Sequence, residues 1–266
     1  MRVKEIRCKS VLSRSKLADY CINCYVGCQH ACVYCYAEYY TKKYTNHTED
    51  WGSFLDVKIN APEVLRKEIT RKKRGAVFIS SLTDPYLPLE SKYELTRKCL
   101  EILLKNNFSV CIQTKSSLVL RDLDLLKKFR ECEVGFTITT LDDTARKVFE
   151  PFSSPVEERL NALRILKENG IKTYVFFGPV LPFISDKNLE EYFTKISRFT
   201  DYFYVDKLNI KPGIWSKIEN VVKSVYPDLV ESWDKIFFQT SNYYRELKEK
   251  IKALADKNGI KVIFCY

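Results

Sequence analysis

The sequence predicts an α/β protein whose core is an open, partial barrel of six βα units. Three observations predict this architecture: short β-rich runs alternate with amphipathic segments, the runs begin roughly 25 to 40 residues apart, and each run is apolar almost throughout. Such apolar runs are typical of parallel strands covered on both faces. Six units fall short of the eight that close a barrel, so we expect an open barrel with its active site at the carboxyl ends of the strands.

The expected strands follow a first strand that precedes Cys28. They are Ala76 to Ser81, Ser109 to Lys115, Glu133 to Thr140, Lys172 to Val180 and Phe203 to Asn209. The expected helices between them are Pro62 to Lys72, Tyr93 to Lys105, Leu118 to Phe129, Pro155 to Asn169 and Asn188 to Phe199. In the fourth helix, Ser154 and Pro155 match an N-cap and a first helical residue. Glu157 would complete a capping box, and Gly170 would end the helix.

The regular spacing of strands and helices ends after Asn209. The segment KPGIW is followed by a helix expected from about Asn242 to Asn258 and by the strand-like run IKVIFCY. We therefore divide the chain into a core over residues 1–215, with a cysteine-rich loop at 24–36, and a C-terminal α/β extension over residues 216–266. The extension is expected to pack on the core.

The composition predicts a globular, cytoplasmic, metal-binding chain with no membrane partner. The longest uncharged apolar stretch, Thr173 to Ile184, is shorter than the roughly 18 residues that cross a membrane. Five of the ten cysteines crowd between positions 21 and 35, which suits a reduced metal site better than disulfides. The net charge of +10 favours a polyanionic partner if the excess is gathered on one face. The densest basic run, Arg66 to Arg74, suits either a solvated helix end or a nucleic-acid contact.

The stretch NCYVGCQHACVYCYAEYY, residues 23–40, is compatible with three kinds of metal site. In the first, the C-x2-C pairs that begin at Cys21 and Cys32 bind zinc, although the seven residues between the pairs are few for that pattern. In the second, four thiolates hold a 4Fe-4S cluster that only carries electrons. In the third, the C-x3-C-x2-C cysteines bind three irons and leave the fourth iron open to S-adenosylmethionine, whose reductive cleavage gives a 5'-deoxyadenosyl radical.

Other catalytic patterns are missing from the sequence. His30 and His47 have no Ser or Cys triad order around them, and His30 is expected to lie in the loop near the metal. The glycines stand at least eight positions apart, which excludes a P-loop and a GxGxxG turn. The cysteine loop is therefore the main candidate for chemistry.

Four longer stretches form a more specific pattern. They are NCYVGCQHACVYCYA, FISSLTDPYLPLE, TKSSLVLRDLDLL and VGFTITTLDD followed by FEPFSSPVEERLNAL. From about Lys9 to Pro182 the chain resembles the radical S-adenosylmethionine enzymes of the spore photoproduct lyase-like group. The resemblance implies a partial, open (β/α)6 TIM-like barrel of the radical SAM type, a 4Fe-4S cluster, S-adenosyl-L-methionine and an external one-electron reductant of the ferredoxin or flavodoxin type.

The resemblance also implies two sets of site residues. The metal ligands are Cys28, Cys32 and Cys35. The cofactor-binding residues are Tyr34, Thr83, Asp84, Lys115, Ser116 and Thr137. Tyr34 is expected near the adenine, Thr83 and Asp84 near the methionine amino group, and Lys115 and Ser116 near its carboxylate or the ribose. Independently, a lysine that closes a strand at the barrel mouth suits a cofactor that carries a carboxylate.

Two positions depart from the family pattern. Where the lyases that repair thymine dimers carry a cysteine that returns a hydrogen atom to the substrate radical, this chain has Leu82, so DNA photoproduct repair is in doubt. Cys24 stands where the other members of the family usually have proline. We therefore interpret Cys24 as a substitution at a non-ligand position and Cys21 as incidental to the motif.

Three functions stay open at this point, and no catalytic residue is assigned. The first is a radical enzyme that acts on nucleic acid, as the net charge favours. The second is a radical enzyme that acts on a metabolite, peptide or protein side chain. The third, a non-enzymatic iron-sulfur or zinc protein, would not need the cofactor-binding segments TKS and LTD.

Overall fold

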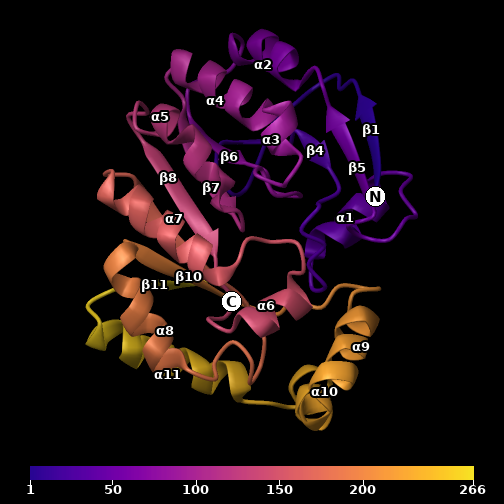
Figure 1. Ribbon diagram of the computed structural model, residues 1–266, viewed down its shortest axis with the longest axis vertical. Helices are drawn as coiled ribbons and strands as arrows, with labels where there is room; N and C mark the ends of the chain where they lie inside the picture. The colour runs from indigo at the N-terminus through magenta and orange to yellow at the C-terminus, as the bar shows by residue number, and fades with distance from the viewer.

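A curved sheet forms the frame of the computed structural model, which describes residues 1–266 (Figure 1). Its eight strands, in spatial order, are β2 Leu12–Arg14, β3 Tyr20–Ile22, β6 Ala76–Ile79, β7 Ser109–Thr114, β8 Cys132–Thr137, β9 Lys172–Val180, β10 Tyr202–Lys207 and β11 Lys261–Phe264. All neighbours run parallel except β2, which pairs antiparallel with β3. The edge strands β2 and β11 do not pair with each other, so the prediction of an open barrel is confirmed.

Helices cover the outer face of the sheet in an arc (Figure 1). They are α2 Ala61–Ile69, α4 Leu95–Lys105, α5 Leu123–Leu126, α7 Val156–Glu168, α8 Leu189–Ile196 and α11 Tyr243–Lys257. The remaining helices are α1 Tyr36–Tyr44, α3 Glu90–Tyr93, α6 Asp143–Phe149, α9 Trp215–Val225 and α10 Val230–Phe238. One apolar core of 47 buried residues joins the outward-facing side chains of the strands to the covering helices.

In β6 and β7 only the outer face is fully covered, whereas β8 and β9 carry consecutive buried residues, so the expectation of a sheet buried on both faces is confirmed for one part of the sheet and wrong for the other. In β7, Val110 and Ile112 are buried in the core, whereas the alternate residues Cys111 and Gln113 are half-buried. Because successive side chains of a strand point to opposite faces, these alternate residues face the barrel interior. At β6 and β7 the inner face therefore stays partly exposed.

A second, three-stranded sheet was not predicted. Its order is β1 Arg2–Ile6, β5 Phe54–Lys58 and β4 Tyr25–Val26, and β4 leads directly into the cysteine loop. Gly27 follows β4 with a φ of +89°, and a side chain there would come within 2.6 Å of the Phe54 carbonyl oxygen. Only glycine therefore fits between this sheet and Cys28.

The helix start predicted at Pro155 is wrong by one residue. Pro155 is the N-cap, α7 begins at Val156, and the Ser154 hydroxyl accepts a hydrogen bond from the Ser117 backbone N–H (3.0 Å), so the predicted capping box does not form. The Ser154 hydroxyl therefore bonds to Ser117, in a distant segment, and does not cap its own helix. The predicted stop is confirmed, because Gly170 follows the helix with a φ of +76°.

The C-terminal residues contribute a strand to the eight-stranded sheet and two helices beside the cysteine loop. β11 pairs parallel with β10 and so adds a seventh parallel strand to the six that were predicted. α9 and α10 stand apart from the helical arc, close to α6 (Figure 1). Their side chains, including Ile218 and Trp233, share a small apolar core with Cys32 and Tyr34 of the cysteine loop. No helix is long and apolar enough to span a bilayer.

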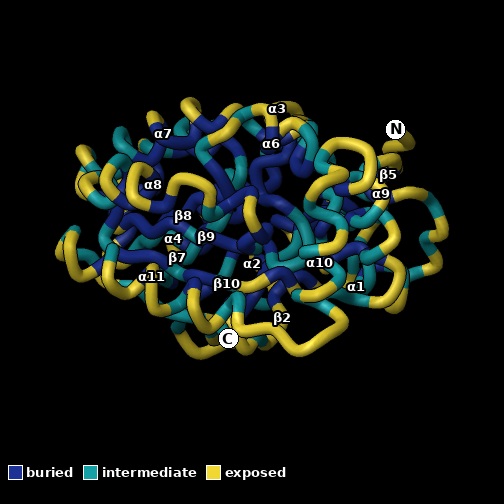
Figure 2. The backbone as a smooth tube through the Cα atoms, turned by 90° about the horizontal axis from the view of Figure 1, so that it is seen from below, coloured by how far each residue is buried: buried dark blue, intermediate teal, exposed yellow.

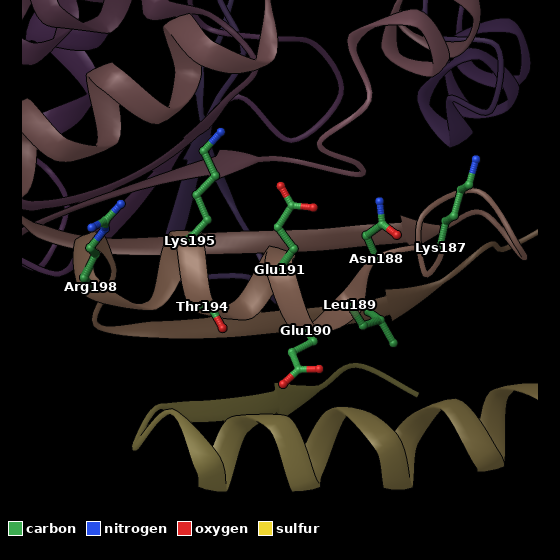
Figure 3. A pocket seen from close by; sticks show the side chains of 8 residues that line it. All are labelled: Lys187, Asn188, Leu189, Glu190, Glu191, Thr194, Lys195 and Arg198. Atoms are coloured by element: carbon green, nitrogen blue, oxygen red, sulfur yellow. The ribbon is translucent and has the colours of Figure 1, made fainter.

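Two hollows lie away from the cysteine loop. One of about 930 Å³ follows α8, where Figure 3 shows basic and acidic side chains side by side, among them Lys195 and Glu191. The other, of about 450 Å³, is lined by Ser109, Cys132 and Lys172, the first residues of β7, β8 and β9. It therefore lies at the amino ends of the strands, opposite to the end at which barrel active sites form.

Candidate active site

The cysteine loop joins β4 to α1. Cys28 and Cys32 are buried, and Cys35 is half-buried as the N-cap of α1. Two turns shape the loop: the Cys28 carbonyl oxygen accepts from Ala31 N (3.4 Å) and the Cys32 carbonyl oxygen accepts from Cys35 N (3.2 Å). Figure 2 shows the loop's neighbours α1 and α10 among the half-buried and exposed parts of the backbone.

The donor set of this loop fits an iron-sulfur cluster. Burial is the main cause that raises the pKa of each of the three thiols to about 12, and each thiol also lies close enough to a second one to contribute. A bound metal supplies the positive charge that makes such thiols ligating thiolates. As the side chains stand, no three His, Cys, Asp or Glu residues meet in a group that could hold a metal ion.

Asp84 holds the loop from the side of β6. Its carboxylate accepts hydrogen bonds from the Thr114 hydroxyl (2.6 Å) and the Lys115 backbone N–H (2.8 Å), which lie at the end of β7. It also lies 3.2 Å from His30 Nε2, in the middle of the loop. Burial alone would raise the pKa of Asp84, but its interaction with His30 and its hydrogen bonds from the Thr114 hydroxyl and the Tyr86 backbone N–H lower that pKa to about 2.

Glu150 holds the loop from the opposite side. It follows α6, is fully buried, and accepts hydrogen bonds from the Tyr34 hydroxyl and from the Thr139 hydroxyl (3.1 Å). Arg159 of α7, also buried, forms an ion pair with it at 2.6 Å. Burial alone would raise the pKa of Glu150, but Arg159 and Lys115 together lower it.

The backbone strengthens this second attachment. Phe149 accepts from Val33 N at 2.9 Å, and Phe152 donates to the His30 carbonyl oxygen at 3.4 Å. His30 Nδ1 lies 3.0 Å from the Phe152 carbonyl oxygen. The cysteine loop is therefore fixed between the end of β6 and residues 149–152.

Lys115 supplies a cation between these two carboxylates. Its ammonium lies 5.8 Å from the centre of the Tyr34 ring and forms no hydrogen bond or ion pair. Burial would lower the pKa of Lys115, but Cys32, Glu150 and Asp84 raise it, in that order of effect. The lysine is therefore held charged, close to the thiols, with its donors free.

The other cofactor-binding residues implied by the resemblance lie at the same edge of the sheet but use their side chains internally. The Thr83 hydroxyl donates to the Gly27 carbonyl oxygen (2.6 Å) and the Ser116 hydroxyl accepts from Leu118 N (3.3 Å). The Thr137 hydroxyl accepts from the Gln113 side chain at 3.2 Å. The structure thus brings Tyr34, Asp84 and Lys115 around the loop. Thr83 reaches it through Gly27, the residue before Cys28, whereas Ser116 and Thr137 bond to partners outside the loop.

Sequence reasoning missed Glu150 and Arg159. Each carried a weak signal: Arg159 falls on the buried stripe of α7 with Val156 and Leu160, where an arginine needs a buried partner, and Glu150 stands immediately before Pro151 at the end of α6. Neither signal indicates that Glu150 and Arg159 are partners of each other.

The remaining cysteines of the segment point elsewhere. Cys24 Sγ lies 3.7 Å from Cys99 Sγ in the buried core, and Cys21 Sγ lies 3.2 Å from the Ser81 hydroxyl. Leu82 packs against the small apolar cluster that contains Cys28. Cys24 thus has a core partner of its own, outside the C-x3-C-x2-C group.

The comparisons with known proteins agree with this site. The family model described as "Radical SAM superfamily" matches residues 22–196. The chain therefore belongs to the radical SAM superfamily and is an enzyme that uses a 4Fe-4S cluster and S-adenosylmethionine. Membership of this superfamily excludes the two alternatives left open by the sequence, a zinc site and a 4Fe-4S cluster that only carries electrons.

Two related sequences and one solved structure show which proteins this chain is similar to. An uncharacterized protein of Methanocaldococcus jannaschii is 36% identical over 260 residues, covering 97% of this chain and 95% of its own. The radical SAM Nalpha-GlyT isomerase of Pseudomonas phage M6 is 21% identical over 252 residues, covering 90% of this chain and 52% of its own. Among solved structures, spore photoproduct lyase complexed with dinucleoside spore photoproduct gives a TM-score of 0.71 at 18% identity, covering 98% of this chain and 82% of that one. The fold resemblance expected from the sequence is confirmed.

Proposed function

We propose that Cys28, Cys32 and Cys35 hold the 4Fe-4S cluster and that the chain cleaves S-adenosylmethionine reductively to abstract hydrogen from a substrate. When bound, the cluster and cofactor supply the electron and the 5'-deoxyadenosyl radical. The observation that carries the proposal is the free Lys115 ammonium beside three thiols, two of them buried, on a loop fixed at both sides.

The chain's own residues then have distinct tasks. Lys115 binds the carboxylate of the cofactor as a point charge, which its free donors allow. Tyr34, held by Glu150, orients the loop near the adenine. Asp84 is already hydrogen-bonded three times, so we assign it the positioning of His30 and of the Lys115 backbone, in place of the amino-group contact expected from the resemblance.

We further propose that the substrate is of the nucleic-acid type. The net charge of +10 and the likeness to a lyase complexed with a dinucleoside support this class. The ten free cysteines also suit a reducing compartment such as the cytoplasm. The reaction differs from lesion repair that relies on a thiol at this position, because Leu82 has no S–H bond from which a substrate radical could take a hydrogen atom.

The decisive experiment is anaerobic reconstitution followed by reduction with dithionite and addition of S-adenosylmethionine. Release of 5'-deoxyadenosine supports the proposal, and its absence together with an unchanged cluster spectrum contradicts it. Binding of a single-stranded oligonucleotide should weaken steeply as salt is added, because each phosphate contact releases counterions. Failure to bind at low salt would exclude the nucleic-acid class and leave the radical chemistry standing.

A further inference from the structure

A row of tyrosines leaves the site along α1. Tyr36, Tyr40 and Tyr44 are spaced four residues apart, so they share one face of the helix. The ring centres of Tyr36 and Tyr40 are 6.1 Å apart, and those of Tyr40 and Tyr44 are 6.3 Å apart with the planes stacked. Tyr36 is 46% exposed and Tyr44 70% exposed. Neighbouring exposed rings of this kind form a contiguous patch, and such patches mark interaction sites.

The row begins where the cysteine loop comes closest to solvent. Cys35, the residue before Tyr36, is half-buried, whereas Cys28 and Cys32 are buried. The Tyr36 hydroxyl donates to the Ser81 carbonyl oxygen at 2.7 Å, which fixes the first ring of the row. Anything that docks on the row is therefore brought next to the outermost of the three thiols.

The outward charges of α1 are positive. Its one carboxylate, Glu38, is 3% exposed and is neutralised by Lys42 (2.9 Å) and by Lys217 of α9 (2.5 Å). Lys43 is exposed, and its ammonium lies 5.6 Å from the centre of the Tyr44 ring. The face therefore combines stacked aromatic rings with a lysine that no carboxylate neutralises, on a chain of net charge +10.

We propose that this tyrosine row is the docking surface for the one-electron donor, a small redox protein with an acidic surface. The proposal rests on the proposed function. Electron transfer weakens steeply with distance, so a donor must approach where the cluster loop is nearest to solvent. Tyrosine is enriched in protein interfaces, and a lysine at the rim speeds the encounter with an acidic partner. In this step the donor loses one electron and the cluster gains it, with no bond made or broken.

The test uses reduced flavodoxin as the probe, because it is an acidic one-electron carrier. The variants are Tyr44→Ala, Lys43→Glu and their combination. Phe238→Ala, which removes a ring 60% exposed on α10, and Lys105→Glu at the exposed end of α4 are matched controls. The readout is the rate at which flavodoxin reduces the reconstituted cluster without S-adenosylmethionine, followed by absorbance.

We expect the double variant to need about tenfold more flavodoxin to reach the half-maximal rate, whereas the controls behave as wild type. Reduction by dithionite should stay unchanged in all variants. Equal flavodoxin dependence in wild type and double variant overturns the proposal, and so does a loss that also appears with dithionite. Weaker binding of a single-stranded oligonucleotide at unchanged flavodoxin dependence would overturn it in favour of a base-stacking surface. If flavodoxin reduces the cluster but no 5'-deoxyadenosine is released once S-adenosylmethionine is added, that result would contradict the proposed function alone.

Discussion

Replacing Arg159 by methionine isolates the buried ion pair that holds the cysteine loop. Arg159 is 1% exposed and Glu150 is fully buried, so the variant leaves a carboxylate without its cation in the core. Breaking such a pair costs about 3 to 5 kcal/mol. The arginine also donates to the Thr137 carbonyl oxygen (2.9 Å) and the Ser154 carbonyl oxygen (2.8 Å), and each lost donor adds about 1 kcal/mol. We expect a loss of about 5 to 7 kcal/mol in the free energy of unfolding.

The assay is urea unfolding followed by circular dichroism, with Arg164→Met as control. Arg164 lies on the same helix but pairs with Glu168 at the surface, where both side chains are about half exposed, so its loss should cost at most about 0.5 kcal/mol. The double variant Glu150→Gln/Arg159→Met should recover part of the loss, because no charge is then buried unpaired.

The pH dependence gives the sharper test. In the wild type the pKa of Glu150 is lowered, so its contribution is present above the unfolded value of about 4.3 and is lost as the pH falls. Without Arg159, burial dominates and raises that pKa, so protonation relieves the variant. The destabilisation by Arg159→Met should therefore shrink between about pH 8 and about pH 5. A variant as stable as wild type, or a loss of stability that does not change with pH, refutes this reasoning.

Three further predictions concern the site. Cys24→Ala should still assemble the cluster, because Cys24 contacts the core, whereas Cys28→Ala should lose the intact cluster; iron and sulfide content measured after reconstitution decides between the two. Lys115→Met should keep the cluster but raise the Kd for S-adenosylmethionine by about tenfold or more in calorimetry, and an unchanged Kd would remove its assigned role. Asp84→Asn should cost about 2 kcal/mol at neutral pH, because the pKa of Asp84 is lowered to about 2 from about 3.9. That cost should vanish in urea titrations as the pH falls from about 4 to about 2; a cost that persists there would mean that the carboxylate charge is not what matters.

Local patterns predicted the parallel strands because burial of one face leaves a signal in every strand. All six predicted strands are present, with ends that differ by a few residues. The sheet of β1, β5 and β4 escaped prediction because β4 has only two residues and β1 is exposed along most of its length, so neither strand carries an apolar run. The helical pair α9 and α10 escaped because its apolar face covers the cysteine loop, a partner about 180 residues away in the sequence.

In the site, too, the local features were predictable from the sequence and the contacts between distant residues were not. Cysteine spacing is a local property, so the loop and its third, open-iron interpretation were accessible from the sequence. The two attachments of the loop are not local, since His30 reaches Asp84 and Tyr34 reaches Glu150 across 54 and 116 positions. No single-sequence pattern encodes which carboxylate meets which donor.

The charges around the loop explain why these attachments matter for the chemistry. Each buried carboxylate already has a cation or several donors of its own: Glu150 has Arg159, and Asp84 has His30 and three hydrogen bonds. Lys115 consequently forms an ion pair with neither carboxylate and stays charged without a partner. Three thiolates and a cofactor carboxylate bring negative charge into this low-dielectric space, where an unpaired anion is costly. The two carboxylates therefore fix the loop without competing for the cation that the cofactor site needs.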